Sequence, residues 1–146
     1  MAKPFESSPK HKKPSLELAL HILHRTERIF GYEPLYDLTE ENIEKIRAAI
    51  EIPFVSFLGE EKYKTLSEKA AATLFLVSKN HAFGNGNKRT AVILTLLLLY
   101  ENDKWVNFTA RQLYNISLKF TGSKAKNPDA SIMKLAKIFE KHIIDC

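Results

Sequence analysis

The sequence predicts an all-α domain, a helical bundle around one central buried helix, with one short β-hairpin. Three observations support this fold class. Apolar residues recur at helical spacing through most of the chain, and start and stop signals separate the helical segments. Residues 91–100 are apolar at nearly every position, which is typical of a helix enclosed on all sides. The chain has no internal repeat and no heptad pattern that would indicate another architecture.

Two helices and a break are predicted in the first part of the chain. The first helix covers residues 15–30, where leucine and isoleucine recur at helical spacing before Gly31. Thr39 begins the second helix, because two glutamates follow it at the positive end of the helix dipole, and Pro53 ends that helix. Residues 53–64 then contain strand formers on both sides of a glycine. We expect a short hairpin there, with its turn at residues 59–61.

The remaining elements are helices with clear start signals. Thr65 and Glu68 form a capping box for a helix to about residue 80, and the glycines and asparagines of residues 81–87 predict a loop. The central buried helix follows over residues 88–102. The last two helices are predicted from a second capping box, Thr109 with Gln112, to a stop at Gly122, and from the start signal Asn127-Pro128.

Composition and charge narrow the function classes. The 146 residues, with 45% apolar and 27% charged side chains, fit one folded domain, and no apolar run approaches the ~20 residues that cross a membrane. No signal peptide is evident, and the single Cys146 allows no internal disulfide, so we expect a cytoplasmic protein with no membrane partner.

The net charge of +5 lies mostly at the start of the chain. Lysines and prolines predict a flexible basic tail over residues 1–14, followed by a single domain over residues 15–146. The basic cluster at residues 10–13 is compatible with nucleic acid or an acidic partner. A solvated end explains it more simply, so nucleic acid is not an expected partner.

The segment from His81 to Arg89 contains the candidate functional residues, and it leads directly into the most buried helix. A helix N-terminus leaves backbone N–H groups unpaired and attracts anions. Gly84 and Gly86 allow the backbone to approach a ligand closely, and Asn87 is able to cap the helix and to donate to an oxygen.

Lys88 and Arg89 stand at the end of the helix where cations are unfavourable, and this local conflict indicates a counter-anion. Phosphate is the natural candidate. His81 beside this site is suited to act as a general base, although a lone histidine is more often structural. The residues alone therefore favour a phosphoryl- or nucleotidyl-transfer site and leave a plain solvated surface as the alternative.

The run His-x-Phe-x-x-Gly-Asn-Lys-Arg-Thr-Ala at residues 81–91 resembles the active-site motif of the Fic/Doc family. It is closest to the Doc (death-on-curing) branch, the toxins of toxin–antitoxin modules. Residues 52–59 and 63–72 are similar to the family's flap and to the helix that follows it. The resemblance covers residues 16–143, with residues 53–91 its most specific part, and implies a Fic/Doc-type helical bundle.

This resemblance implies a role for each matching residue. His81 would be the general base that deprotonates a hydroxyl of a target protein. The residues implied to bind ATP through its phosphates are Gly84, Gly86, Asn87, Lys88 and Arg89. The flap would present the target segment by strand pairing, and its implied target-binding residues are Phe54, Val55, Ser56 and Phe57.

Two positions distinguish the AMP-transferring members of the family from the Doc-like members. Lys88 stands where AMP-transferring members usually have glycine, and Val92 stands where they usually have a further arginine. Both departures favour the Doc-like protein kinase type, which transfers the terminal phosphate of ATP, and a translation elongation factor is the expected target class. No inhibitory helix motif is evident, so an antitoxin protein supplied in trans is the expected partner.

Asn85 stands where the family usually has the Asp or Glu that binds Mg²⁺. A neutral amide oxygen is a weaker ligand for Mg²⁺ than a carboxylate, so metal affinity should fall. Two hypotheses therefore stay open. One is a transferase, of the kinase type or, as an alternative, of the AMPylation type. The other is a non-catalytic binding module that keeps the Fic/Doc fold.

Overall fold

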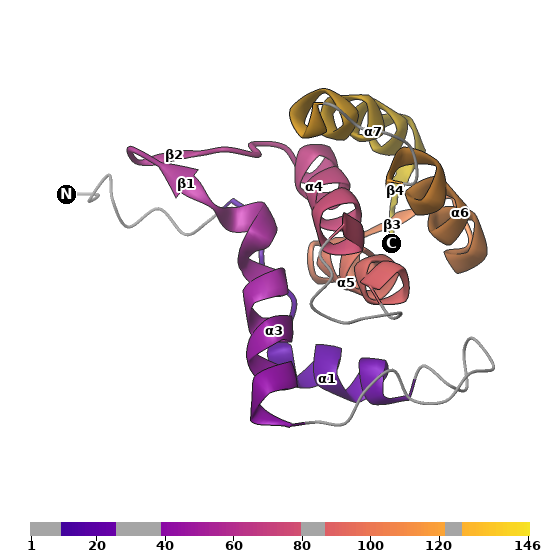
Figure 1. Ribbon diagram of the computed structural model, residues 1–146. Helices are drawn as coiled ribbons and strands as arrows, with labels where there is room; N and C mark the ends of the chain where they lie inside the picture. Colours follow the sequence, from indigo (N-terminus) through magenta and orange to yellow (C-terminus); the bar gives the residue numbers. More distant parts are fainter. Residues whose placement is uncertain (1–9, 26–38, 80–86, 122–126) are drawn as a thin grey trace.

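The computed structural model describes residues 10–25, 39–79, 87–121 and 127–146 (Figure 1). Most of these residues are helical, which confirms the predicted all-α class. The α-helices are α1 (Leu16–His24), α3 (Glu40–Glu51), α4 (Leu66–Lys79), α5 (Asn87–Glu101), α6 (Ala110–Thr121) and α7 (Pro128–His142). The short elements are the 3-10 helix η1 (Ile52–Phe54) and the strands β1 (Ser56–Phe57), β2 (Glu60–Glu61), β3 (Lys104–Val106) and β4 (Ile143–Asp145).

Helices α4 and α5 form the centre of the bundle (Figure 1). α4 packs against α5 and α7, while α5 also contacts α6 and α1. α3 joins α1 on the other side and leads through η1 into the β1–β2 hairpin, which extends away from the helices. The hairpin therefore lies in the chain immediately before α4, and α4 ends shortly before the candidate functional segment, residues 81–89.

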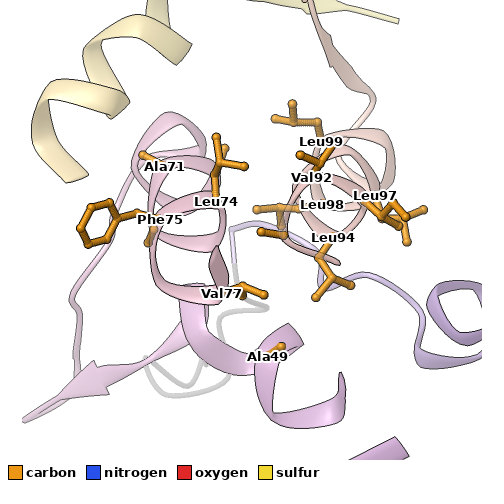
Figure 2. Close-up of a cluster of buried hydrophobic side chains, with 14 of the residues drawn as sticks. Ala49, Ala71, Leu74, Phe75, Val77, Val92, Leu94, Leu97, Leu98 and Leu99 are labelled. Atoms are coloured by element: carbon orange, nitrogen blue, oxygen red, sulfur yellow. The ribbon is translucent and has the colours of Figure 1, made fainter. Parts of the chain in front are cut away.

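The core confirms the prediction of a central buried helix. Figure 2 shows Leu74 and Val77 of α4 facing Leu98 of α5, while Phe75 points to the opposite side of α4. All four side chains are buried. Burying a leucine or phenylalanine side chain contributes about 1.5–3 kcal/mol, so the α4–α5 interface is a main source of stability. No helix in the described part of the chain is long and apolar enough to span a membrane.

The predicted helix starts are confirmed by their caps. The backbone N–H of Asn42 donates to Thr39 Oγ1 (3.2 Å), and that of Glu68 donates to Thr65 Oγ1 (3.0 Å). In the capping box before α6 the two bonds are reciprocal. Thr109 N–H donates to Gln112 Oε1 (2.8 Å), and Gln112 N–H donates to Thr109 Oγ1 (3.1 Å). At the start of α7 the side chain of the N-cap residue Asn127 accepts from Ala130 N–H (3.2 Å).

The hairpin is confirmed, but two details of its prediction are wrong. The turn lies at Leu58 and Gly59, with φ of 52° and 81°, and the residues expected in the turn, Glu60 and Glu61, form β2. Positive φ at both central residues is the pattern of a two-residue turn whose twist matches the strands. The strand formers before the hairpin instead form η1, because Pro53 fits the first turn of a helix and cannot donate in a strand ladder.

The structure differs from the prediction at the end of the first helix and in a second small sheet. α1 ends at His24, where the N–H of Arg25 bonds back to the carbonyls of Ile22 and Leu23, and residues 26–30 of the predicted helix lie outside the described residues. The strands β3 and β4 were not predicted. They pair in antiparallel register with Trp105 opposite Ile144, and this short sheet ties the end of the chain to the segment after α5.

Candidate functional site

The structure describes only part of the predicted site. His81, Gly84, Asn85 and Gly86 lie outside the described residues. Asn87 is the first residue of α5, and its side chain lies outside the described part of the chain as well. The described parts of the predicted site are the two helix ends that flank residues 80–86 and the flap.

Lys88 and Arg89 lie in the first turn of α5, as the sequence predicts, and both are half-buried. That turn contains no acidic residue. Two cations therefore add to the partial positive charge of the helix N-terminus, which is an electrostatic environment suited to a phosphate group. Their partial burial strengthens the attraction, because nearby protein replaces part of the screening water.

Sequence reasoning missed two buried hydroxyl groups at the same two helix ends. Ser78 lies in the last turn of α4 and Thr90 in the first turn of α5, and each is almost completely buried. Neither hydroxyl has a hydrogen-bond partner among the residues that the structure describes. A buried hydroxyl without a partner costs about 1–3 kcal/mol, and both hydroxyls keep hydrogen-bonding capacity that the described residues do not use. No sequence pattern signals it, because serine and threonine in helices usually bond to their own backbone.

The flap residues implied to bind the target differ in their exposure. Phe54 in η1 is half-buried, whereas Val55 and Ser56 are exposed and Phe57 is 76% exposed. β1 pairs only with β2 among the described strands, so the sheet has an open edge. An open edge beside exposed apolar side chains is able to accept an additional strand through backbone hydrogen bonds.

Two further observations on the described residues concern metal and ligand binding. No group of three or more His, Cys, Asp or Glu side chains in this part of the chain is placed to hold a metal ion. A pocket of about 410 Å³ is lined by residues of α1, α5, β3 and α6, with Trp105 and Tyr100 among them. Its lining contains no charged side chain and none of the predicted site residues, so it does not suit a nucleotide phosphate.

Comparison with known protein families gives a match. The model of the family described as Fic/DOC matches residues 15–99, which is more than half of the chain. The match includes the hairpin, α4, residues 80–86 and nearly all of α5. Comparison with curated proteins and with solved structures gives no match.

Proposed function

Because the chain belongs to the Fic/DOC family, we propose that it is a Doc-like protein kinase that transfers the terminal phosphate of ATP to a protein hydroxyl. Family membership supports a nucleotide-transferring protein modifier in general. The observation that carries the proposal is the pair Lys88 and Arg89, half-buried in a helix turn without an acidic residue. The kinase type rests on Lys88 and Val92, the two departures from the AMP-transferring members.

The proposed reaction assigns one task to each residue. His81 accepts the proton of the target hydroxyl, whose oxygen attacks the γ-phosphorus of ATP. The bond from that phosphorus to the oxygen bridging the β-phosphate breaks, and ADP leaves with the bond's electron pair. Lys88, Arg89 and the N–H groups at the start of α5 stabilise the charge on the phosphates. Gly84, Gly86 and Asn87 complete the phosphate-binding segment.

The flap is proposed to hold the target segment. An extended stretch of the target pairs with the open edge of the hairpin and covers the exposed side chains of Val55 and Phe57. Backbone pairing supplies affinity without demanding a particular target sequence. Specificity then depends on the side chains that contact Phe54, Ser56 and Phe57.

The biological role proposed with this activity is that of a toxin. The target class is a translation elongation factor in the cytoplasm, and an antitoxin protein supplied in trans blocks the activity. Co-expression of the neighbouring reading frame tests this role. A co-purifying partner that relieves toxicity supports it, and a chain that is not toxic when expressed alone contradicts it.

A second candidate function is a non-catalytic binding module, and Asn85 is the observation that favours it. ATP binding through Lys88 and Arg89 requires no carboxylate at position 85, whereas Mg²⁺ does prefer one. Under this alternative the chain binds nucleotide or a partner without turnover.

Incubation with ATP labelled at the α or the γ position, Mg²⁺ and a cell lysate separates these functions. We expect γ-label on a protein band, and its loss in His81→Ala. His21→Ala is the matched control, because His21 is exposed on α1 and belongs to no part of the proposed site. Transfer of α-label identifies AMP transfer instead. Retained nucleotide binding with neither label identifies the binding module and overturns the kinase.

A further inference from the structure

Lys69 of α4 is a lysine with no exposed surface, which is rare for this residue type. A buried ammonium group is stable only when hydrogen bonds and opposite charge replace its water. The Nζ atom of Lys69 lies 3.2 Å from Glu61 Oε1 and donates to the carbonyl oxygen of Tyr63. It also lies 5.3 Å from the centre of the Phe54 ring, within the range of a cation–π interaction.

The three partners of Lys69 all belong to the flap, and they lie on both sides of its turn. Phe54 precedes β1, Glu61 is in β2, and Tyr63 follows β2. One ammonium group therefore holds both legs of the hairpin against α4. Tyr63 is itself buried, so this end of the flap is part of the core while its tip is exposed.

The hairpin needs such an anchor because it is too small to hold its own orientation. β1 and β2 pair at two positions only, Ser56 with Glu61 and Phe57 with Glu60, and Lys62 N–H adds a bond to the Val55 carbonyl (3.0 Å). An isolated hairpin of this size is at best marginally stable in water.

We propose that Lys69 is a positioning residue for the flap. It holds the open strand edge in a fixed orientation relative to α4, the helix that ends directly before residues 80–86. Lys69 acts through the hairpin and does not touch the reacting atoms. The inference rests on the proposed function only in that the flap is taken to present the target hydroxyl.

The segment at residues 10–14 lies beside the same anchor. Lys13 Nζ is 5.6 Å from the centre of the Phe54 ring and forms an ion pair with Glu51 (2.7 Å). Burial, together with the nearby charge of Lys69, lowers the pKa of His11. This shift favours the uncharged imidazole, which places no second positive charge beside the buried ammonium of Lys69.

Hydrogen exchange of the hairpin amides tests the proposal without reference to catalysis. Glu61→Ala removes the counter-charge of Lys69, and Lys69→Met removes all three contacts while keeping an unbranched side chain of similar length. We expect exchange at the Lys62 amide to accelerate by about tenfold in both variants, while amides of α5 stay protected. Glu60→Ala, on the same strand but away from Lys69, is the control and should exchange as the wild type does.

Equal exchange in Glu61→Ala and Glu60→Ala overturns the positioning role, and this comparison is decisive even where Lys69→Met fails to fold. In the transfer assay, Glu61→Ala should raise KM for the protein target with little change in kcat. The reason is that the flap binds the target, whereas His81 accepts the proton in the chemical step. A fall in kcat at unchanged KM contradicts the proposal. A wild-type chain that transfers no label disproves the kinase but leaves the exchange comparison valid.

Discussion

Lys12 and Asn102 exchange two hydrogen bonds although they lie 90 positions apart in the chain. Lys12 N–H donates to Asn102 Oδ1 (2.8 Å), and Asn102 Nδ2 donates to the Lys12 carbonyl (2.9 Å). Asn102 Nδ2 also donates to the carbonyl of Leu98 at the end of α5 (2.7 Å). One amide side chain thus caps the central helix and holds the segment before α1. Lys12 thus contacts the folded bundle although it lies in the segment predicted as a tail. The predicted division of the chain between residues 14 and 15 stays a prediction.

Asn102→Ala should lower the free energy of unfolding by about 1–3 kcal/mol, because it removes both bonds to the Lys12 backbone and the partly buried bond to the Leu98 carbonyl. Urea denaturation measures this change. Asn107→Ala is the control, since Asn107 is exposed after β3, and it should stay within about 0.5 kcal/mol of the wild type. Equal losses in the two variants would show that the exchange between Lys12 and Asn102 contributes nothing specific.

Leu98→Ala should destabilise the protein by about 2–5 kcal/mol, because Leu98 is buried between α4 and α5 and its removal leaves a cavity (Figure 2). The matched control is Leu118→Ala on α6, whose side chain is 41% exposed and should cost far less. Thermal or urea unfolding measures both. A small loss in Leu98→Ala would contradict the central position of α5.

The two buried threonines of α5 should respond differently to valine. Thr95 Oγ1 donates to the Ala91 carbonyl (2.7 Å), whereas Thr90 Oγ1 has no partner among the described residues. Thr90→Val should therefore be more stable than Thr95→Val by about 1 kcal/mol. Calorimetric binding of ATP gives a second measurement. Weaker binding in Thr90→Val alone would indicate that this hydroxyl serves the phosphate site, and equal stability of the variants would refute the difference.

Stability should fall on acidification because of His11. Burial first, and the charges of Lys69 and Lys10 next, lower the pKa of His11, while Glu61 opposes them. The folded state thus favours neutral imidazole. Its contribution is present above the ordinary histidine pKa of about 6.5 and is lost as the pH falls through that value towards the lowered folded pKa.

Urea unfolding between pH 7.5 and pH 5 measures the effect of His11. His11→Gln should flatten the pH dependence in this window, whereas His21→Gln on the exposed face of α1 should retain the wild-type slope. A slope that is the same in all three proteins would rule out His11 as its source.

Asn85→Asp should raise Mg²⁺ affinity and transfer activity, because a carboxylate binds Mg²⁺ more strongly than an amide oxygen. Titration of activity and of nucleotide binding with Mg²⁺ measures the change. Asn115→Asp on the exposed face of α6 adds the same charge elsewhere and should leave the titration unchanged. A wild-type titration curve in Asn85→Asp would mean that position 85 does not touch the ion.

Sequence alone determined the helices and their starts, because these depend on neighbours in the chain. Thr39, Thr109 and Asn127 cap the helices that follow them, and the apolar run of α5 required burial on all sides. The cations at the start of α5 were also evident from local chemistry, since they oppose the helix dipole.

Tertiary structure decided the contacts between distant segments. The pairing of Trp105 with Ile144, the link from Lys12 to Asn102 and the burial of Lys69 join segments that only the packed bundle brings together. Each was missed because no local pattern encodes it: a three-residue strand has no readable period, and a lysine in a helix is ordinarily solvated. Removing these polar groups and charges from water costs free energy unless suitable partners replace the water, and only the folded chain provides those partners.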